Sequence, residues 1–217
     1  VISEPMPLAK QGKIAFFKDY LYISEPEKGI HIIDNRNPEH PVSVGFIELL
    51  GNADMAIKDN ILYADSYIDM VWFDISSPAT PKFLGRKVDV FPEAFPKPEN
   101  EYGIDYSKVS DRTKGVVVAW KLRERTETYI REHNIWGWWP GVFEKGDMVI
   151  NSSPLSGAVG KTGSMSRFAI YENYLYTVMS NQLGIYNIET ANPKKVSDNF
   201  YVGWNVETIF SYKNCMY

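Results

Sequence analysis

The sequence predicts an all-β protein built from a repeated unit, and three observations support this. A tyrosine within a short apolar run recurs at one spacing, because Tyr22 and Tyr63 are 41 residues apart and so are Tyr176 and Tyr217. Apolar and polar residues alternate around these tyrosines, as in half-buried strands. The order Asp, Pro-x-x-Pro, Gly found at 34–45 returns in register at 74–85. A period of about 40–45 residues made of short strands predicts a β-propeller of short antiparallel blades.

The first two repeats show the plan in order. In the first, strand material is expected at 14–23 around a turn at 18–19, then at 30–33 and 42–46, with a polar turn at 25–29. In the second, the equivalents are 55–63, 71–73 and the run ending at Gly85. The chain length of 217 residues suits one all-β domain. We therefore expect a single propeller over 1–217, incomplete in this chain, with an irregular insertion at 92–164.

The insertion interrupts the repeat. Pro92, Pro96 and Pro98 predict an extended loop. Residues 115–131 open with three valines and alternate, which predicts one long strand or two with a bend, while a helix over 121–132 is the alternative because Arg and Glu favour helices. The stretch 157–163 is no phosphate-binding loop, because the required first glycine is missing and no helix pattern follows.

The end of the chain repeats the plan and then stops. Residues 213–217 open a further strand whose usual partner would follow about ten residues later. The hypothesis is that the chain is a fragment, or that the strand at Tyr217 pairs with another segment or a second chain. Cys215, the lone cysteine, lies in an apolar pattern and is expected to be a core thiol.

Composition excludes several classes of function. The net charge of −4 offers no basic field for nucleic acid. No apolar run approaches the roughly 20 residues of a membrane span, and no signal peptide is visible. Val1 is not a native start residue, so the sequence leaves open whether a leader has been removed or is absent from this sequence.

The pattern of histidines and carboxylates indicates structural rather than catalytic roles. His31, His40 and His133 lack the spacing of metal ligands, so we predict no metal site and no cofactor. Asp34, Asp74 and Asn187 end matching strands, and we expect them to cap turns. A ring of carboxylates that binds Ca²⁺ is the alternative, but the uncharged Asn at the third copy favours turn capping. The pairs Asp65/Asp69 and Asp54/Asp59 could serve acid–base chemistry, but their separation is not given by sequence. No catalytic residue is therefore assigned.

The candidate ligand-binding residues are aromatic. Trp136, Trp138 and Trp139 form a cluster beside His133. Exposed tryptophans offer flat faces to sugar rings or anchors to a protein partner. The alternative is a hydrophobic plug that covers the insertion. Trp72 and Trp120 are expected in strand core.

The repeat resembles a known family. The runs GIHIID and MVWFD, followed by a loop with Pro-x-x-Pro and a glycine, resemble the LVIVD repeat over 14–85 and again over 166–217. The middle stretch, with GVVVAWKL and GSMSRFAIYENYLY, is similar to LVIVD-containing surface lipoproteins of the Bacteroidetes. Pro78 has Ala191 as its counterpart, in a loop one residue shorter. The resemblance implies an extracytoplasmic, often membrane-anchored propeller at the cell surface or in the periplasm, and supplies no catalytic residues.

Two function classes remain. The sequence favours a non-enzymatic binding or interaction propeller that presents loops and aromatic residues to a protein or glycan. The alternative is a hydrolase or lyase that uses the central channel, and it rests on fold analogy alone. Converging carboxylates or histidines would favour the enzyme.

Overall fold

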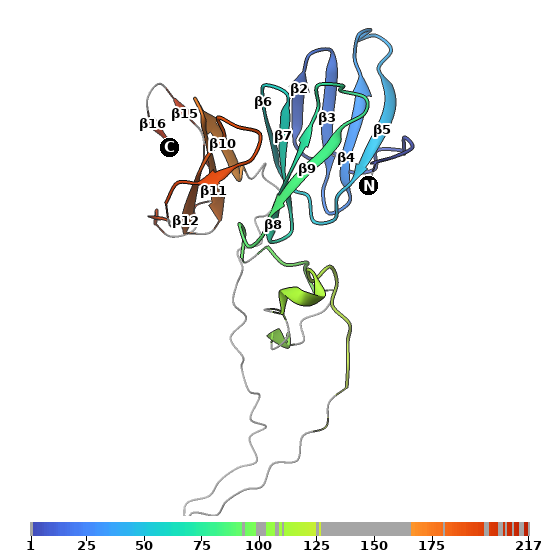
Figure 1. Ribbon diagram of the computed structural model, residues 1–217. Coiled ribbons are helices and arrows are strands. Elements are labelled where there is room, and N and C mark those ends of the chain that lie inside the picture. The colour runs from blue at the N-terminus through green and yellow to red at the C-terminus, as the bar shows by residue number, and fades with distance from the viewer. Residues whose placement is uncertain are drawn as a thin grey trace, which may run out of the picture.

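The computed structural model describes residues 2–92, 94–98, 103–106, 109, 111–124, 126, 166–179, 181–197, 200–203, 206, 208–209, 211–212 and 215–216. Within these ranges the protein is all-β with antiparallel sheets, which confirms the predicted fold class. Figure 1 shows the first two sheets beside each other on the right and a third sheet on the left. No helix in the described ranges is long and apolar enough to cross a membrane.

Each blade is a four-stranded meander. The first blade consists of β2 (Ile14–Phe17), β3 (Tyr20–Glu25), β4 (Gly29–Asp34) and β5 (Val42–Glu48), and β1 (Ile2–Ser3) adds to its outer edge. The second consists of β6 (Met55–Lys58), β7 (Ile61–Ser66), β8 (Asp69–Asp74) and β9 (Lys82–Lys87). The third consists of β10 (Phe168–Tyr171), β11 (Tyr174–Met179), β12 (Gln182–Asn187) and β13 (Lys194–Lys195), with β14 (Phe200–Tyr201) also on β12. The last strands are β15 (Ser211–Tyr212) and β16 (Cys215–Met216), which pair with each other.

The repeated tyrosines occupy the second strand of each of the three blades. Tyr22, Tyr63 and Tyr176 lie in β3, β7 and β11, and the apolar residues before them form strands of their own. The hairpins before these strands repeat as well, because Lys18, Asp59 and Glu172 have φ of 52°, 51° and 49°. The sequence repeat is therefore a repeat of backbone conformation.

One of the two glycines in register, Gly85, has a packing role. Both outer strand pairs carry a β-bulge at the same place, between Ile32 and Ile33 in the first blade and between Trp72 and Phe73 in the second. Gly85 faces Trp72 there, and a Cβ on Gly85 would lie 2.5 Å from Cζ2 of the indole. Only glycine lets the outer strand pass that close to the ring.

The core lies between blades rather than within one. One apolar cluster joins the first and second blades, and includes Tyr22, Ile32, Leu62 and Val71. A second joins the second and third blades, and Phe91 from the segment after β9 packs into it edge-on against Phe168 at 5.5 Å. The innermost strands β2, β6 and β10 lie side by side in that order, as innermost propeller strands do.

Three predictions are wrong in the described ranges. Residues 115–124 form neither strand nor helix, because Trp120 packs against Phe95 and Tyr106 and donates its Nε1–H to the carbonyl of Pro96 at 2.6 Å. Trp120 is thus a half-buried loop residue, whereas Trp72 is buried in β8 as expected. Cys215 is exposed and not a core thiol.

Candidate functional site

Buried polar side chains gather at one end of the blades. This end, called the polar end below, carries the β3–β4 turn, the β5–β6 loop and the β7–β8 turn. The buried polar or charged residues of the described ranges all lie at or near it: Ser24, Glu25, His31, Asn52, Asp54, Asp65, Ser66, Asp69 and Thr177. Polar groups stay buried only when they have partners, so their contacts show what this end can do.

Three charged residues meet where the blades converge. Lys13, Asp54 and Arg167 each directly precede the innermost strand of a blade. Lys13 Nζ lies 3.2 Å from Oδ1 of Asp54, and the Asp54 Oδ2 accepts the backbone N–H groups of Arg167 at 2.6 Å and Phe168 at 3.1 Å. The single carboxylate of Asp54 therefore joins three blades.

Asp65 extends this network. Its Oδ1 accepts the backbone N–H groups of Ala53 at 2.7 Å and Asp54 at 3.0 Å, together with the side-chain amide of Asn52. Its Oδ2 takes the guanidinium of Arg167 at 2.6 Å. Asp65 thus fixes the loop before β6 and ties it to the third blade.

These contacts decide the chemistry of the two carboxylates. Burial raises the pKa of the Asp54 carboxyl above its ordinary value, the Lys13 ammonium opposes that rise, and the neighbouring Asp65 adds to it. A paired carboxylate with a raised pKa is a familiar acid–base arrangement. Here, however, each oxygen of both carboxylates already accepts a protein donor and both side chains are fully buried. The arrangement holds blades together rather than reaching a substrate.

A second buried carboxylate pairs with histidine. Glu25 Oε2 lies 2.8 Å from His31 Nε2, and its Oε1 lies 2.5 Å from Lys28 Nζ. The hydrogen bonds from Lys28 and then from His31 lower the pKa of Glu25 to about 2. His31 packs on Phe46 with ring centroids 4.7 Å apart, and its Nδ1 is buried without a hydrogen-bond partner in the structure. His31 is therefore hydrogen-bonded at one of its two ring nitrogens.

The third ionic group ties the loop after β9 to the second blade. Asp69 is fully buried at the start of β8. Its Oδ2 accepts from Arg86 Nη1 at 2.8 Å, and its Oδ1 accepts from Arg112 Nη2 at 2.6 Å and from the backbone N–H of Asp89 at 3.1 Å. Arg112 belongs to the short 3-10 helix η2 (Arg112–Lys114). One carboxylate thus orients two guanidinium groups.

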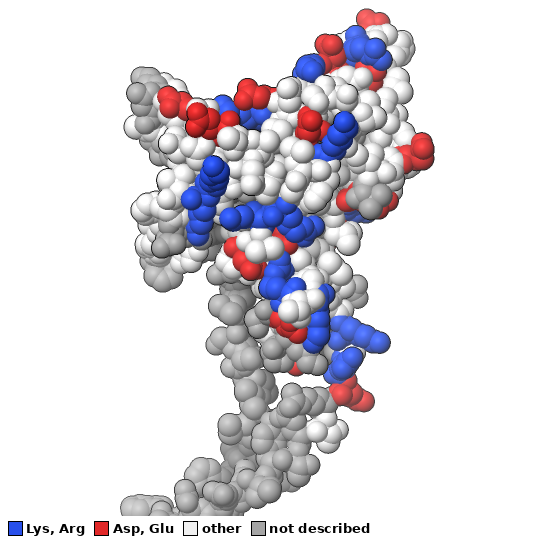
Figure 2. Space-filling model, in the orientation of Figure 1, with Lys and Arg blue, Asp and Glu red and all other residues white. Residues whose placement is uncertain are grey.

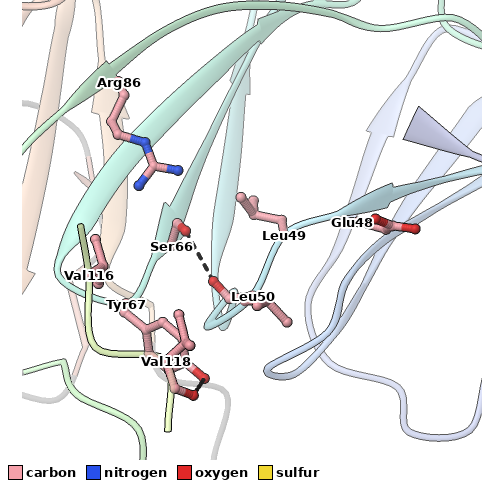
Figure 3. A pocket seen from close by; sticks show the side chains of 8 residues that line it. All are labelled: Glu48, Leu49, Leu50, Ser66, Tyr67, Arg86, Val116 and Val118. Carbon is pink, nitrogen blue, oxygen red and sulfur yellow. Dashed lines mark hydrogen bonds between the residues drawn. The ribbon is translucent and has the colours of Figure 1, made fainter. Parts of the chain in front are cut away.

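A pocket of about 200 Å³ opens beside this group, between the first two blades and the segment after η2 (Figure 3). Its lining residues are Glu48, Leu49, Leu50, Ser66, Tyr67, Arg86, Val116 and Val118. The Ser66 hydroxyl donates to the carbonyl of Leu50 at 3.0 Å, and the Tyr67 hydroxyl donates to that of Val118 at 3.3 Å. Leu50 is 54% exposed and Val118 is 50% exposed, so the rim of the pocket is apolar and open to solvent.

The turn residues singled out by the sequence lie at the opposite end of the blades. Asp34 accepts the backbone N–H of the residue two positions on at 3.1 Å, Asp74 does so at 2.8 Å and Asn187 at 2.9 Å. These are Asx turns at three equivalent positions. They hold loops and leave the polar end to other residues.

The aromatic candidates are not placed. Trp136, Trp138, Trp139 and His133 lie outside the described residues, as does Tyr217. Asp65 and Asp69, which the sequence suggested as a pair, have different partners. Asp65 contacts Arg167, whereas Asp69 contacts Arg86 and Arg112. Among the described residues no group of three or more His, Cys, Asp or Glu could hold a metal ion.

Sequence reasoning missed the residues that converge at the polar end. Lys13 and Asp54 are one repeat apart and opposite in charge, and each stands one position before an inner strand. An alignment of the repeats would have revealed this pair. The role of Arg86 could not be predicted in this way, because nothing in the sequence brings it beside Leu50 and Val118.

Comparison with known proteins supports the repeat. The LVIVD repeat model matches residues 11–47, which cover most of the first blade, and residues 162–194, which cover most of the third. No curated protein matches the chain. A solved structure from Saccharomyces cerevisiae, a Dbp5 variant bound to Nup159, a Gle1 variant, IP6 and ADP, is similar at 10% identity with a TM-score of 0.38. The similarity covers 87% of this chain and 30% of that one, so the present chain spans less than a third of its length. The chain is an all-β protein of propeller type, and two of its segments match the LVIVD repeat.

Proposed function

We propose that this protein is a non-enzymatic binding propeller that presents its polar end to a partner outside the cytoplasm. The observation that carries the proposal is the pocket at the polar end, where exposed Leu50 and Val118 frame the cation of Arg86. Arg is one of the residue types most enriched at the anchoring points of protein interfaces. Loops on a rigid sheet scaffold are the usual carriers of such sites.

The buried carboxylates support binding over catalysis. A hydrolase or lyase would need an acid or base within reach of a substrate. Asp54 and Asp65 are fully buried and bound by protein donors, and Glu25 is held by Lys28 and His31. The extracytoplasmic part of the proposal rests on the resemblance to LVIVD-containing surface proteins. Fractionation of the source cells would test it, with the protein expected outside the cytoplasm.

A matched pair of valine substitutions tests the binding surface. Val118 at the pocket rim is 50% exposed, and Val42, at the opposite end of β5, is 57% exposed. The parent protein and the variants Val118→Asp and Val42→Asp would be applied to a peptide array and a glycan array. We expect the ligands that bind the parent to bind Val42→Asp equally well and not to bind Val118→Asp.

The same arrays can contradict the proposal. Ligands that bind all three proteins alike would place binding on another surface. Blank arrays, together with turnover of a glycoside or ester substrate by the parent, would favour the enzyme instead. Thermal melts of both variants should match the parent, because neither valine is buried.

A further inference from the structure

The pocket at the polar end combines one cation with apolar walls. Of the eight residues that line it, Arg86 alone is positively charged, and Leu49, Leu50, Val116 and Val118 supply aliphatic surface. Figure 3 shows the guanidinium of Arg86 pointing into the space above Leu49 and beside Val116. Glu48 lies on the other side, and its carboxylate points away from Arg86 (Figure 3). The pocket therefore offers a positive end and an apolar body.

Arg86 is held in place and stays partly exposed. Its Nη1 donates to Asp69 at 2.8 Å, and its side chain remains 41% exposed. The same carboxylate also binds Arg112, whose Nε lies 3.4 Å from a second carboxylate, that of Asp89. Figure 2 shows Lys and Arg atoms over the lower end of the β6–β9 sheet, where the next segment begins, with Asp and Glu atoms among them. A guanidinium fixed on one side can receive a carboxylate on another, with two parallel hydrogen bonds.

The size of the pocket limits the ligand. Its volume of about 200 Å³ is below the 300–1,000 Å³ typical of small-molecule sites, so we expect it to take a single residue-sized group. The hydroxyl protons of Ser66 and Tyr67 are already donated to the carbonyls of Leu50 and Val118. A sugar, which needs several polar partners, suits these walls poorly. An aliphatic group joined to a carboxylate suits them well.

Within a peptide, an apolar side chain and a carboxylate share one residue only at the carboxyl terminus. We propose that the pocket binds the free carboxyl terminus of a peptide that ends in an aliphatic residue, with the carboxylate on Arg86 and the side chain against Leu49 and Val116. This inference rests on the proposed binding function and names the ligand class of the same site. Terminal carboxylate capture is a recurring mode of peptide recognition.

Fluorescence anisotropy with a labelled peptide tests the inference. The probe is Gly-Gly-Ser-Gly-Leu with a free carboxyl terminus, compared with its C-terminal amide and with a free acid that ends in Gly. We expect the leucine acid to bind the parent protein about tenfold or more tightly than either control, because a charge-assisted hydrogen bond or a buried aliphatic side chain is lost. The acid and amide comparison needs no variant and is unaffected by folding defects.

Variants locate the carboxylate. Arg86→Gln should weaken the leucine acid about tenfold and leave the amide unchanged, whereas Arg86→Lys should lose less. Arg36→Gln is the matched control, since Arg36 is likewise paired with an aspartate but lies at the opposite end of the blades. Equal binding of acid and amide, full binding by Arg86→Gln, or no binding of the leucine acid would each overturn the inference.

Two further results separate this inference from the proposed function. If N-acetylleucine binds in competition as tightly as the pentapeptide does, the site takes a small aliphatic carboxylate and the peptide assignment is wrong. If the pentapeptide fails but the arrays give a ligand that Val118→Asp loses, the ligand class is wrong while the binding function stands. If arrays and probe are both blank, both proposals fall.

Discussion

Replacing Asp54 with alanine should remove the contact that joins three blades. The carboxylate accepts from Lys13, from the backbone of Met55 and from the backbone N–H groups of Arg167 and Phe168. Alanine would leave buried N–H donors without an acceptor, at about 1–3 kcal/mol each. Breaking a buried ion pair by removing one partner typically costs about 3–5 kcal/mol.

These costs overlap, because the same atoms enter both, so we expect a loss of about 3–5 kcal/mol in the free energy of unfolding. Lys13 is 26% exposed on its side chain and can regain water, which argues against a larger value. Against a typical total of about 5–15 kcal/mol, this loss would shift the unfolding midpoint strongly. Lys13→Met should be milder, because the three backbone donors to Asp54 remain.

The assay is equilibrium unfolding in urea, followed by far-UV circular dichroism and by tryptophan fluorescence. Asp74→Ala is the control, since Asp74 makes one Asx turn at the opposite end and should cost far less. A loss below about 1 kcal/mol for Asp54→Ala, or one equal to that of Asp74→Ala, would refute the interblade role. The two probes should give coincident curves if the blades unfold together.

Two other predictions concern pH and packing. The pKa of Glu25 is about 2 in the folded protein against an ordinary value of 4.5, so its stabilising effect should be complete above about pH 4.5 and be lost as pH falls toward 2. Glu25→Gln should therefore flatten the fall of the melting temperature over that range, and parallel curves would contradict this. Gly85→Ala should cost about 1–3 kcal/mol in urea unfolding, because the new Cβ would lie 2.5 Å from the indole of Trp72. An unchanged midpoint would show that the ring shifts freely.

Local patterns in the sequence were enough to predict the blades. The tyrosine spacing, the turn at 18–19 and the glycines Gly45 and Gly85 all act within about 40 residues. The alternation that marks Ile14 to Phe46 as strands is likewise local. The segment 115–124 was mistaken for strand because its three valines fit the same alternation, although Trp120 finds its partners in the preceding loop.

Neighbours along the chain specify the repeat, the all-β class and the places of the turns, because strand pairing and turn chemistry are local. Which charges meet follows instead from the packing of the blades. Asp54 contacts Arg167 across 113 residues, and Arg86 meets Leu50 and Val118 from three separate segments. Such contacts depend on how blades stack and how a loop folds back, and no local pattern encodes those distances.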